Sequence, residues 1–229
     1  MASLWCVVPA AGRGARVGGD IPKQYLPLAG RPLIEHTLAR LATHPRVAGV
    51  MVVLGAGDDR WPGLERIGGK PVLTTLGGAE RCDSVLAGLD ALPAEVKPDD
   101  FVLVHDAARP CVRAADIARL IELAVPAGGG LLGAPLRDTL KRADAAHRSV
   151  ATEPREERWR AFTPQLFRRA ELAAALRAAA AGGFKPSDEA MAMERAGHAP
   201  LLVEGAEDNI KVTTAADFAL AEFLLDRTA

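Results

Sequence analysis

Residues 4–25, LWCVVPAAGRGARVGGDIPKQY, join a short apolar run to a long glycine-rich loop. The run Leu4–Val8 has the length and composition of a buried strand. The loop after it contains four glycines and the fixed cations Arg13, Arg16 and Lys23. Because glycines let backbone N–H groups approach an anion closely, such a loop after a strand is typical of a phosphate site. We therefore expect the chain to bind a phosphate group here.

Two common phosphate-binding motifs do not fit this loop. The dinucleotide fingerprint G-x-G-x-x-G needs a third glycine and an immediate helix, but Val17 occupies that place and Pro22 follows soon after. The acidic residue expected about twenty positions on would be Glu35, which falls inside a helical pattern. A Walker loop is excluded because no Gly-Lys-Ser/Thr closes the motif. A plain glycine-rich turn is the alternative, although Pro22 favours a rigid turn that presents Lys23.

Beyond the loop, short apolar runs alternate with helical patterns. The expected buried strands are Leu4–Val8, Val47–Leu54, Val72–Leu76, Phe101–His105, Gly130–Ala134 and Leu201–Val203. The expected helices are Pro32–Ala42, Arg81–Leu92, Ala114–Ala124, Arg169–Ala181, one opened by Ser187 or Asp188, and Ala215–Asp226 capped by Thr214. This alternation predicts an α/β fold, with one Rossmann-like domain over residues 1–229 around a mostly parallel sheet covered on both faces.

The regular alternation breaks in a charged, weakly patterned segment, approximately residues 137–162. Within it, Thr139–Arg142 and Ser149–Thr152 could form two strands around an Ala-Asp-Ala-Ala turn. This pattern predicts a β-arm that leaves the main body, and a solvated loop is the alternative. An arm with so few apolar residues cannot build its own core, so we expect it to be ordered against another surface.

Composition limits the classes of function. The chain has 229 residues, 28 basic and 29 acidic, and its net charge of −1 gives no bulk reason to expect nucleic acid or a membrane surface. No apolar run approaches the roughly 20 residues of a membrane span and no basic segment precedes an apolar one, so we expect neither a transmembrane helix nor export. The three cysteines, Cys6, Cys82 and Cys111, are sparse and scattered, as is typical of a reducing compartment. We expect a cytoplasmic protein whose anion site is local.

Six stretches of the sequence resemble a known family. They are PAAGRGARVGGDIPKQYLPLAGRPLI (residues 9–34), GGAERCDSV (77–85), VLVHDAARP (102–110), RDT (137–139), TPQ (163–165) and DNIKVT (208–213). Their order and spacing are similar to those of the 2-C-methyl-D-erythritol 4-phosphate cytidylyltransferases, from Leu4 to Leu225. The first stretch marks sugar-nucleotide transferases broadly, whereas HDAARP and DNIKVT together are far more specific. Small departures are Val17 for methionine, Ala79 for a polar or acidic residue, and Ser187 for threonine.

The resemblance implies a nucleotidyl transfer in the non-mevalonate route to isoprenoids. An oxygen of methylerythritol phosphate would attack the α-phosphorus of CTP and release pyrophosphate, so that catalysis is mainly positioning and charge neutralisation. By family position, Arg16 and Lys23 stabilise the pentavalent phosphorus and the leaving pyrophosphate. Arg155 and Lys211 hold and orient the substrate's phosphate. No general base is required, because a phosphate monoester is already anionic near neutral pH.

The resemblance also implies a nucleotide site built from several segments. Its expected residues are Pro9, Ala10, Ala11, Gly12, Gly14, Gly78, Ala79, Arg81, Ser84, Asp106 and Ala107. Glycines near Ala79 allow close backbone approach, and the Ser84 hydroxyl can bond a pyrimidine edge. The departure at Ala79 bears on one base contact. For Arg81, a local cap or ion pair is an equal alternative.

The remaining expected site residues concern the acceptor and a metal ion. Arg109, Thr139, Thr163 and Asp208 are expected to bind the substrate. Asp106 follows a predicted strand, and a carboxylate beside a triphosphate suits Mg²⁺ or another divalent cation. Asp208 could be a second ligand. Alternatively, Asp106 caps the turn into Ala107 and Asp208 bonds only its own loop; His105 is expected to be a packed histidine.

In the resembling family, an arm of this kind completes the partner's active site, so we expect a homodimer with shared sites. The matching residue here is Arg155. Because the sequence ends at Ala229, a fused cyclase is not expected. One alternative function is another sugar-phosphate cytidylyltransferase, for example one acting on ribitol 5-phosphate. A catalytically silent nucleotide-binding regulator is another, which the cations at Arg16, Lys23 and Lys211 disfavour.

Overall fold

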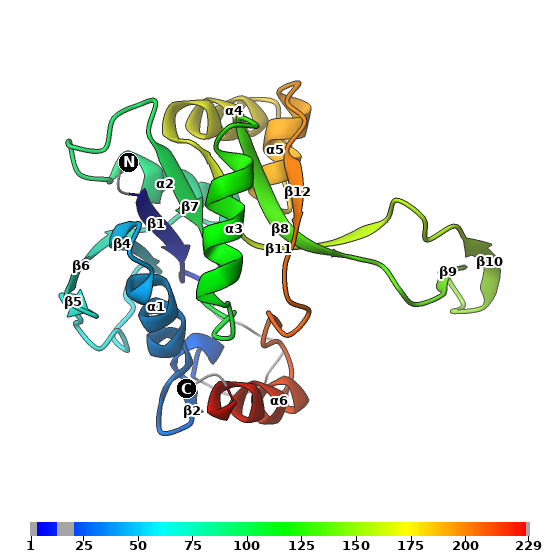
Figure 1. Cartoon of the computed structure of the whole chain (residues 1–229), viewed down its shortest axis with the longest axis horizontal. Helices are drawn as coiled ribbons and strands as arrows, with labels where there is room; N and C mark the ends of the chain where they lie inside the picture. Colours follow the sequence, from blue (N-terminus) through cyan, green and yellow to red (C-terminus); the bar gives the residue numbers. More distant parts are fainter. Residues whose placement is uncertain (1–3, 13–20, 228–229) are drawn as a thin grey trace.

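The computed structural model describes residues 4–12 and 21–227. A large sheet with helices on both faces forms the main body, and a two-stranded β-arm extends from it (Figure 1). This architecture confirms the predicted α/β fold with a mostly parallel central sheet.

The large sheet has the strand order β12-β8-β11-β7-β1-β4-β6-β5. Its strands are β1 (Leu4–Pro9), β4 (Val47–Leu54), β5 (Arg66–Ile67), β6 (Lys70–Leu76), β7 (Phe101–Val104), β8 (Gly129–Pro135), β11 (Trp159–Arg168) and β12 (Leu201–Glu204). β1 runs parallel to β4 and β7, β4 to β6, and β8 to β12. β11 runs antiparallel to β7 and β8, and the short β5 runs antiparallel to β6.

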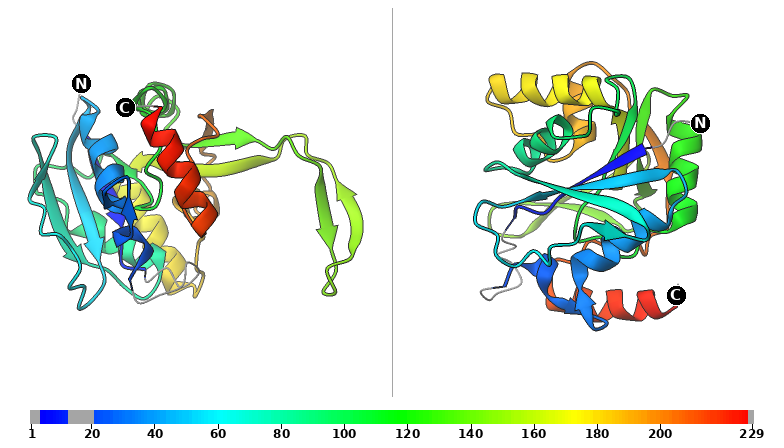
Figure 2. Two further views of the ribbon diagram at one scale, coloured as in Figure 1. Left: turned by 90° about the horizontal axis from the view of Figure 1, so that it is seen from below. Right: turned by 90° about the vertical axis from the view of Figure 1, so that its left-hand side faces the viewer.

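Helices lie on both faces of this sheet (Figure 2). They are α1 (Leu33–Thr43), α2 (Arg81–Asp90), α3 (Ala114–Ala124), α4 (Arg169–Ala181), α5 (Glu189–Arg195) and α6 (Ala215–Asp226). The short elements are the 3₁₀ helix η1 (Lys23–Tyr25) and the hairpin β2 (Pro27–Leu28) and β3 (Arg31–Pro32). Asp188 and Thr214 cap α5 and α6 as predicted. In residues 4–12 and 21–227, no helix has the length and apolar character needed to cross a membrane.

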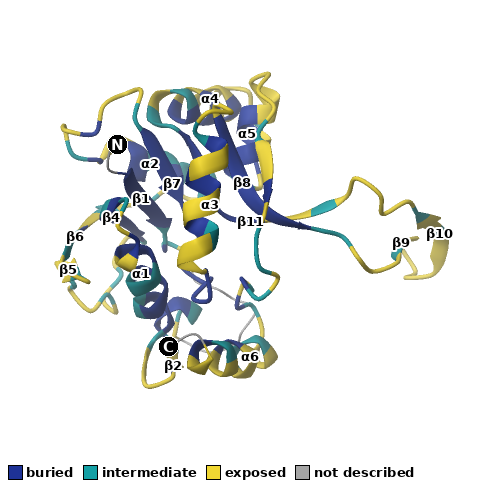
Figure 3. Ribbon diagram, in the orientation of Figure 1, coloured by how far each residue is buried: buried dark blue, intermediate teal, exposed yellow. Residues whose placement is uncertain are grey.

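Two apolar layers hold the helices against the sheet. Alternate side chains of β1 point to opposite faces: Cys6 and Val8 join one core cluster, whereas Trp5 and Val7 join the other. The first cluster includes residues of α1 and α3, and the second includes residues of α2, α4 and α5. β1, β4, β7 and β8 are buried along nearly all of their length (Figure 3). Burial on both faces explains why the parallel strands are continuous apolar runs in the sequence.

The strand order fixes where a site can form. From β1 the chain crosses through α1 to β4 on one side, while β7 pairs with the other side of β1. The loops after β1 and β7 therefore leave the same edge of the sheet at a point where the strand order reverses. Such a switch point is the usual position of ligand sites in open α/β sheets.

The arm is shorter than predicted. Trp159 pairs with Pro135, so the chain from Trp159 onward belongs to β11 in the main sheet. The prediction that the arm extends to Phe162 is therefore wrong for residues 159–162. The sequence hides this strand because Pro164 interrupts it, and a proline normally argues against a central strand. The register with β8 shifts between Ala161 and Gln165, which accommodates the interruption.

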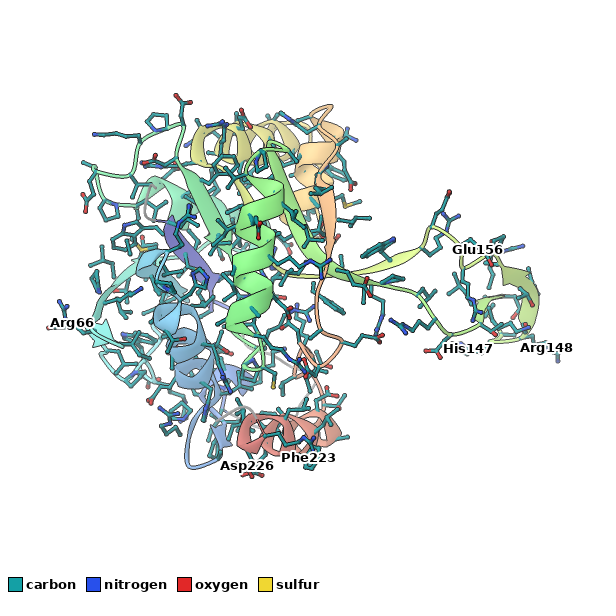
Figure 4. The ribbon with its side chains drawn as sticks, in the orientation of Figure 1. Arg66, His147, Arg148, Glu156, Phe223 and Asp226 are labelled. Carbon is teal, nitrogen blue, oxygen red and sulfur yellow. The ribbon has the colours of Figure 1, made fainter. Side chains whose placement is uncertain are left out.

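The arm itself is the predicted pair of strands. β9 (Leu140–Ala143) and β10 (Ser149–Glu153) are antiparallel and lie apart from the main body in Figures 1 and 2. Val150 at its far end is 50% exposed. Figure 4 shows His147, Arg148 and Glu156 on the arm, apart from the main body. Within this chain, the arm thus packs its strands against each other and builds no apolar layer of its own.

Candidate active site

A cavity of about 250 Å³ lies at the switch point of the sheet. It is lined by Pro9, Ala10, Ala11, Gly12, Lys23, Gln24, Gly78, Ala79, Glu80, Arg81, Ser84, Asp106, Ala107, Ala108 and Lys211. We call it the central cavity. Every described residue that we predicted to bind the nucleotide lines this cavity. Gly14 and Arg16 lie outside the described residues.

Side chains of η1 bind and stabilise the loop after β1. Gln24 is buried, and its side-chain amide donates hydrogen bonds to the carbonyl oxygens of Ala10 (2.7 Å) and Gly12 (3.1 Å). The Lys23 ammonium donates to the carbonyl oxygen of Val212 at 2.9 Å. Pro22 precedes this turn, and the Tyr25 hydroxyl donates to Asp58 at 2.6 Å. The result is a supported turn that places Lys23 at the cavity wall.

Asp106 is a buried carboxylate surrounded by three cations. Its Oδ1 lies 3.0 Å from Arg81 Nε, and its Oδ2 lies 2.8 Å from Lys211 Nζ and 3.6 Å from Arg109 Nε. Burial raises the pKa of Asp106, but Arg81, Lys211 and Arg109 together hold that pKa well below its usual range. Asp106 is therefore ionised at neutral pH, and its charge holds the three cations beside the cavity.

Arg81 joins Asp106 to a second buried carboxylate. Arg81 is the first residue of α2, and its guanidinium donates to both oxygens of Glu189 at 2.6 and 3.1 Å. Burial lowers the pKa of Arg81, but Glu189 and Asp106 outweigh burial and raise it. The alternative of a local cap or local ion pair for Arg81 does not describe these contacts, because both partners are distant in the sequence. The cluster of Arg81, Arg109, Lys211, Asp106 and Glu189 contains three cations and two carboxylates.

A chain of hydrogen bonds through Thr163 connects the Asp106 backbone to the His105 ring. The Thr163 hydroxyl accepts a hydrogen bond from the Asp106 backbone N–H and donates to His105 Nδ1, both at 3.0 Å. His105 Nε2 donates in turn to the carbonyl oxygen of Arg109 at 3.0 Å. Burial lowers the pKa of His105 to about 4, so the ring is neutral at pH 7 and can accept through Nδ1 while donating through Nε2. His105 is the packed histidine that we expected.

Arg109 is anchored by the segment that carries Lys211. Its guanidinium donates to the carbonyl oxygen of Asn209 at 2.6 Å and lies 5.2 Å from the centre of the Phe162 ring. Asn209 is fully buried and donates to the carbonyl oxygen of Thr163 at 2.8 Å. These contacts connect the loop after β7, the bulge in β11 and the chain between β12 and α6.

A second cavity of about 210 Å³ adjoins the first and shares Arg81, Asp106 and Lys211 with it. Its other lining residues are Arg109, Ala161, Phe162, Thr163, Gln165, Ser187 and Asp188. We call it the side cavity. The Asp106 cluster thus lies between two spaces, which suits a reaction that brings two phosphorylated molecules together.

Three predicted residues do not line either cavity. Asp208 pairs with the Arg113 guanidinium. Thr139 and Arg155 belong to the arm, where the Arg155 guanidinium donates to the carbonyl oxygen of Arg137. The partner of Asp208 is 95 positions away in the sequence, so Asp208 does not bond only its own loop. The roles of all three residues in the site stay predictions.

Sequence reasoning missed several polar residues that build the site. Gln24, Gln165, Glu189 and Asn209 are all buried, and each bonds to another part of the chain. Gln24 offered a weak signal, because it follows Lys23 in a turn begun by proline. Glu189 offered another, because it follows Asp188 at the predicted start of a helix. Neither pattern predicts which residue the buried side chain binds.

Three comparisons relate the chain to known proteins. The family model for 2-C-methyl-D-erythritol 4-phosphate cytidylyltransferase matches residues 4–227. The protein of that name from Xanthomonas euvesicatoria is 60% identical over 224 residues, covering 97% of this chain and 85% of its own length. The one from Stenotrophomonas maltophilia (strain K279a) is 58% identical over 229 residues, covering 100% and 99%.

Solved structures agree with the sequence relatives. A 4-diphosphocytidyl-2C-methyl-D-erythritol synthase structure superimposes with a TM-score of 0.86 at 34% identity, covering 99% of this chain and 100% of its own. The 2-C-methyl-D-erythritol 4-phosphate cytidylyltransferase of Francisella tularensis gives 0.85 at 32% identity, covering 97% and 100%. Both similarities extend over nearly the whole chain, arm included.

The buried neutral His105 makes the stability of the fold depend on pH. Its folded pKa of about 4 lies below the value of about 6.5 for an unfolded histidine, so the unfolded chain binds a proton that the folded protein excludes. The free energy of unfolding therefore falls as the pH falls from about 6.5 to about 4. We expect His105→Gln to reduce this fall, measured by urea unfolding at pH 7 and pH 4.5.

His36 and His44 are also buried with lowered pKa values, so part of the pH dependence should persist in the variant. Leu120→Ala is the matched control, because it removes a fully buried apolar side chain and should cost about 2–5 kcal/mol at both pH values. An equal pH dependence in wild type and His105→Gln would contradict the neutral state of His105.

Proposed function

Because the chain belongs to the 2-C-methyl-D-erythritol 4-phosphate cytidylyltransferase family, we propose that the central cavity binds CTP and the side cavity receives the acceptor phosphate. The enzyme transfers CMP from CTP to 2-C-methyl-D-erythritol 4-phosphate, giving 4-diphosphocytidyl-2-C-methyl-D-erythritol and pyrophosphate. This reaction belongs to isoprenoid precursor biosynthesis.

The observation that carries the proposal is the excess of positive charge around Asp106. Arg81, Arg109 and Lys211 outnumber the carboxylates of Asp106 and Glu189, so the cluster can accept further negative charge from a phosphate. The reaction requires two anions to approach each other, and neutralising their charge is the main task of the protein. A cluster shared by two cavities supplies that charge at their junction.

The chemistry is an in-line displacement at phosphorus. An oxygen of the acceptor phosphate forms a bond to the α-phosphorus of CTP, while the bond from that phosphorus to the bridging oxygen breaks. The electron pair of the broken bond leaves with pyrophosphate. We assign Lys23, together with Arg16, to the charge that develops on this leaving group.

Lys211 is assigned to the acceptor phosphate. Its ammonium lies 2.8 Å from Asp106 and lines both cavities. Because an ammonium has three donor positions on a flexible stem, it can turn toward a phosphate without moving the backbone. Arg109 borders the side cavity and adds a second cation to the same phosphate.

A divalent cation fits this donor set through one carboxylate. Mg²⁺ takes oxygen ligands and is commonly held by one or two carboxylates together with substrate phosphates. Asp106 borders the central cavity and would be the protein ligand, whereas Asp208 pairs with Arg113 and borders neither cavity. When bound, Mg²⁺ would neutralise charge on the triphosphate. We therefore propose Asp106 as the ligand and give Asp208 no direct place in this arrangement.

We further propose a homodimer in which each arm completes the partner's site. Two features of the arm support this: β9 and β10 lie apart from the main body, and residues such as Val150 are exposed. Thr139 and Arg155, which belong to the arm, line neither the central cavity nor the side cavity. A two-fold dimer would place both residues at a neighbouring site.

A cytoplasmic location is also proposed. Cys6 and Cys111 are buried, Cys82 is half-buried, and all three are free thiols. Unpaired cysteines are typical of proteins in a reducing compartment.

The first test of this function is a pyrophosphate-release assay with Lys23→Ala. Wild type should release pyrophosphate with CTP and 2-C-methyl-D-erythritol 4-phosphate, but not with ATP, GTP or UTP, nor with ribitol 5-phosphate. Because Lys23 is assigned to developing charge, its loss should lower kcat by about 10²–10³-fold with a much smaller change in the KM for CTP.

Lys97→Ala serves as the control, because Lys97 is exposed and borders neither cavity. It should leave both constants unchanged. A Lys23→Ala enzyme with wild-type kcat and only weaker CTP binding would show that Lys23 merely binds the ground state. Turnover of ribitol 5-phosphate in place of the expected acceptor would reassign the substrate.

The second test concerns the shared site. Arg155→Ala and Lys23→Ala should each be nearly inactive as pure dimers. In a mixed dimer one site lacks both residues and the other lacks neither. After equal amounts exchange subunits, about half of the dimers are mixed, so roughly a quarter of wild-type activity should return. Native mass spectrometry would verify the exchange, and exchange without recovery would show that Arg155 does not serve the partner's site.

A further inference from the structure

Glu189 is a fully buried carboxylate that takes no part in the chemistry described above. It is the first residue of α5, it is 0% exposed, and its two oxygens accept hydrogen bonds from Arg81 Nη1 and Nη2 at 2.6 and 3.1 Å. This two-point contact with a guanidinium is among the strongest polar interactions in proteins. The same Arg81 guanidinium also contacts Asp106, so Glu189 is one residue removed from the cavities, neither of which it borders.

The start of α5 is fixed independently of this ion pair. The side-chain amide of Gln165 on β11 donates to Asp188 at 2.9 Å and accepts from the Ala190 backbone N–H at 2.7 Å. Asp188 also accepts from the Met191 backbone N–H at 3.0 Å, which caps the helix. Glu189 lies between these two anchored residues, so its carboxylate has a fixed position relative to the main sheet.

Because Glu189 accepts from both terminal nitrogens of Arg81, it leaves only Nε of that guanidinium to donate to Asp106. With both terminal nitrogens on Glu189, Arg81 contacts Asp106 Oδ1 through Nε alone, at 3.0 Å. The other oxygen, Oδ2, lies 2.8 Å from Lys211. An arginine released from Glu189 would be able to close on both oxygens of Asp106, because two-point contacts with carboxylates are its preferred geometry. Lys211 would then lose its partner.

We propose that Glu189 is a positioning residue for nucleotidyl transfer, which holds Arg81 so that Asp106 is shared between Arg81 and Lys211. The inference rests on the proposed function, because it concerns the cations that the two substrates meet there. Glu189 touches no substrate in this account. Its effect on the reaction passes through the orientation of Arg81.

A purely structural role predicts a different pattern. Buried ion pairs contribute little net stability, and replacing both partners with neutral groups is often harmless, whereas removing one partner leaves an uncompensated charge. Since Gln165 and the Asp188 cap already fix the start of α5, the charge of Glu189 is not needed to form the helix. A structural role would therefore change the melting temperature and leave kcat per folded molecule intact.

The test is Glu189→Gln in the pyrophosphate-release assay with CTP and 2-C-methyl-D-erythritol 4-phosphate. The substitution keeps the size of the side chain and removes its charge. Because it weakens two hydrogen bonds to a charged group, we expect kcat to fall about 10- to 100-fold, with a far smaller change in the KM for CTP. Glu189→Asp keeps the charge but is shorter, so it should lose less activity. If the glutamine variant does not fold, Glu189→Asp tests the proposal in its place, since a loss of kcat is expected there too.

Met193→Ala is the matched control within α5. Met193 is fully buried and contacts the apolar core of that face, so its loss should lower the melting temperature and leave kcat near the wild-type value. A Glu189 variant that behaves in the same way would overturn the proposal and assign Glu189 a structural role.

A double-mutant cycle tests whether Glu189 acts through Arg81. Arg81→Met alone leaves Glu189 buried and unpaired, whereas Arg81→Met with Glu189→Gln removes both charges and should be more stable than the single variant. If Glu189 acts through Arg81, adding Glu189→Gln to Arg81→Met should cause no further loss of kcat. Losses that multiply would overturn the proposal. An inactive wild type would instead refute the proposed function, and the inference with it.

Discussion

Asp106 keeps a negative charge inside the protein because Arg81, Arg109 and Lys211 surround it, and the rest of the site depends on this arrangement. Each cation comes from a different segment: the start of α2, the loop after β7, and the chain between β12 and α6. A single buried carboxylate thereby connects parts of the chain that are far apart in sequence. Without it, the three cations would repel one another at the edge of the sheet.

The topology of the sheet makes this arrangement possible. β1 and β7 are adjacent and parallel, so the glycine-rich loop after β1 meets the loop that carries Asp106. β11 runs antiparallel beside β7 and brings Thr163 beneath Asp106, where its hydroxyl holds the backbone. From β11 the chain continues into α4 and returns through α5, which places Glu189 behind Arg81. The residues that bind Asp106 and Arg81 in this way therefore lie on strands and helices whose positions the fold fixes.

Much of the fold follows from local patterns in the sequence. The boundaries of Val47–Leu54 and Ala114–Ala124 agree with the prediction, because a continuous apolar run in the first and a helical apolar period in the second both end at clear breaks. The caps at Asp188 and Thr214 agree because capping depends on residues within one turn. β11 was missed because Pro164 and the charged residues before it hide a strand that is buried only through its neighbours. Strand pairing is a property of the assembled sheet, which a local pattern does not contain.

The candidate site also contains residues that the sequence predicts and residues that it does not. The cavity-lining residues from Pro9 to Gly12 and near Ala79 were predictable, because short motifs carry them. Glu189 and Gln165 were not assigned roles, because a buried polar residue has meaning only with its partner, and Arg81 lies 108 positions away from Glu189. Arg155 was predicted from the resemblance, but this single chain holds its side chain at the base of the arm.

The most direct test of the account is a crystal structure of the enzyme with the α,β-methylene analogue of CTP and 2-C-methyl-D-erythritol 4-phosphate. The account predicts the triphosphate in the central cavity beside Lys23, and Lys211 Nζ turned from Asp106 to an oxygen of the acceptor phosphate. Arg81 should remain on Glu189 and Asp106. Both ligands bound while Lys211 still contacts only Asp106, or a nucleotide bound outside the central cavity, would contradict it.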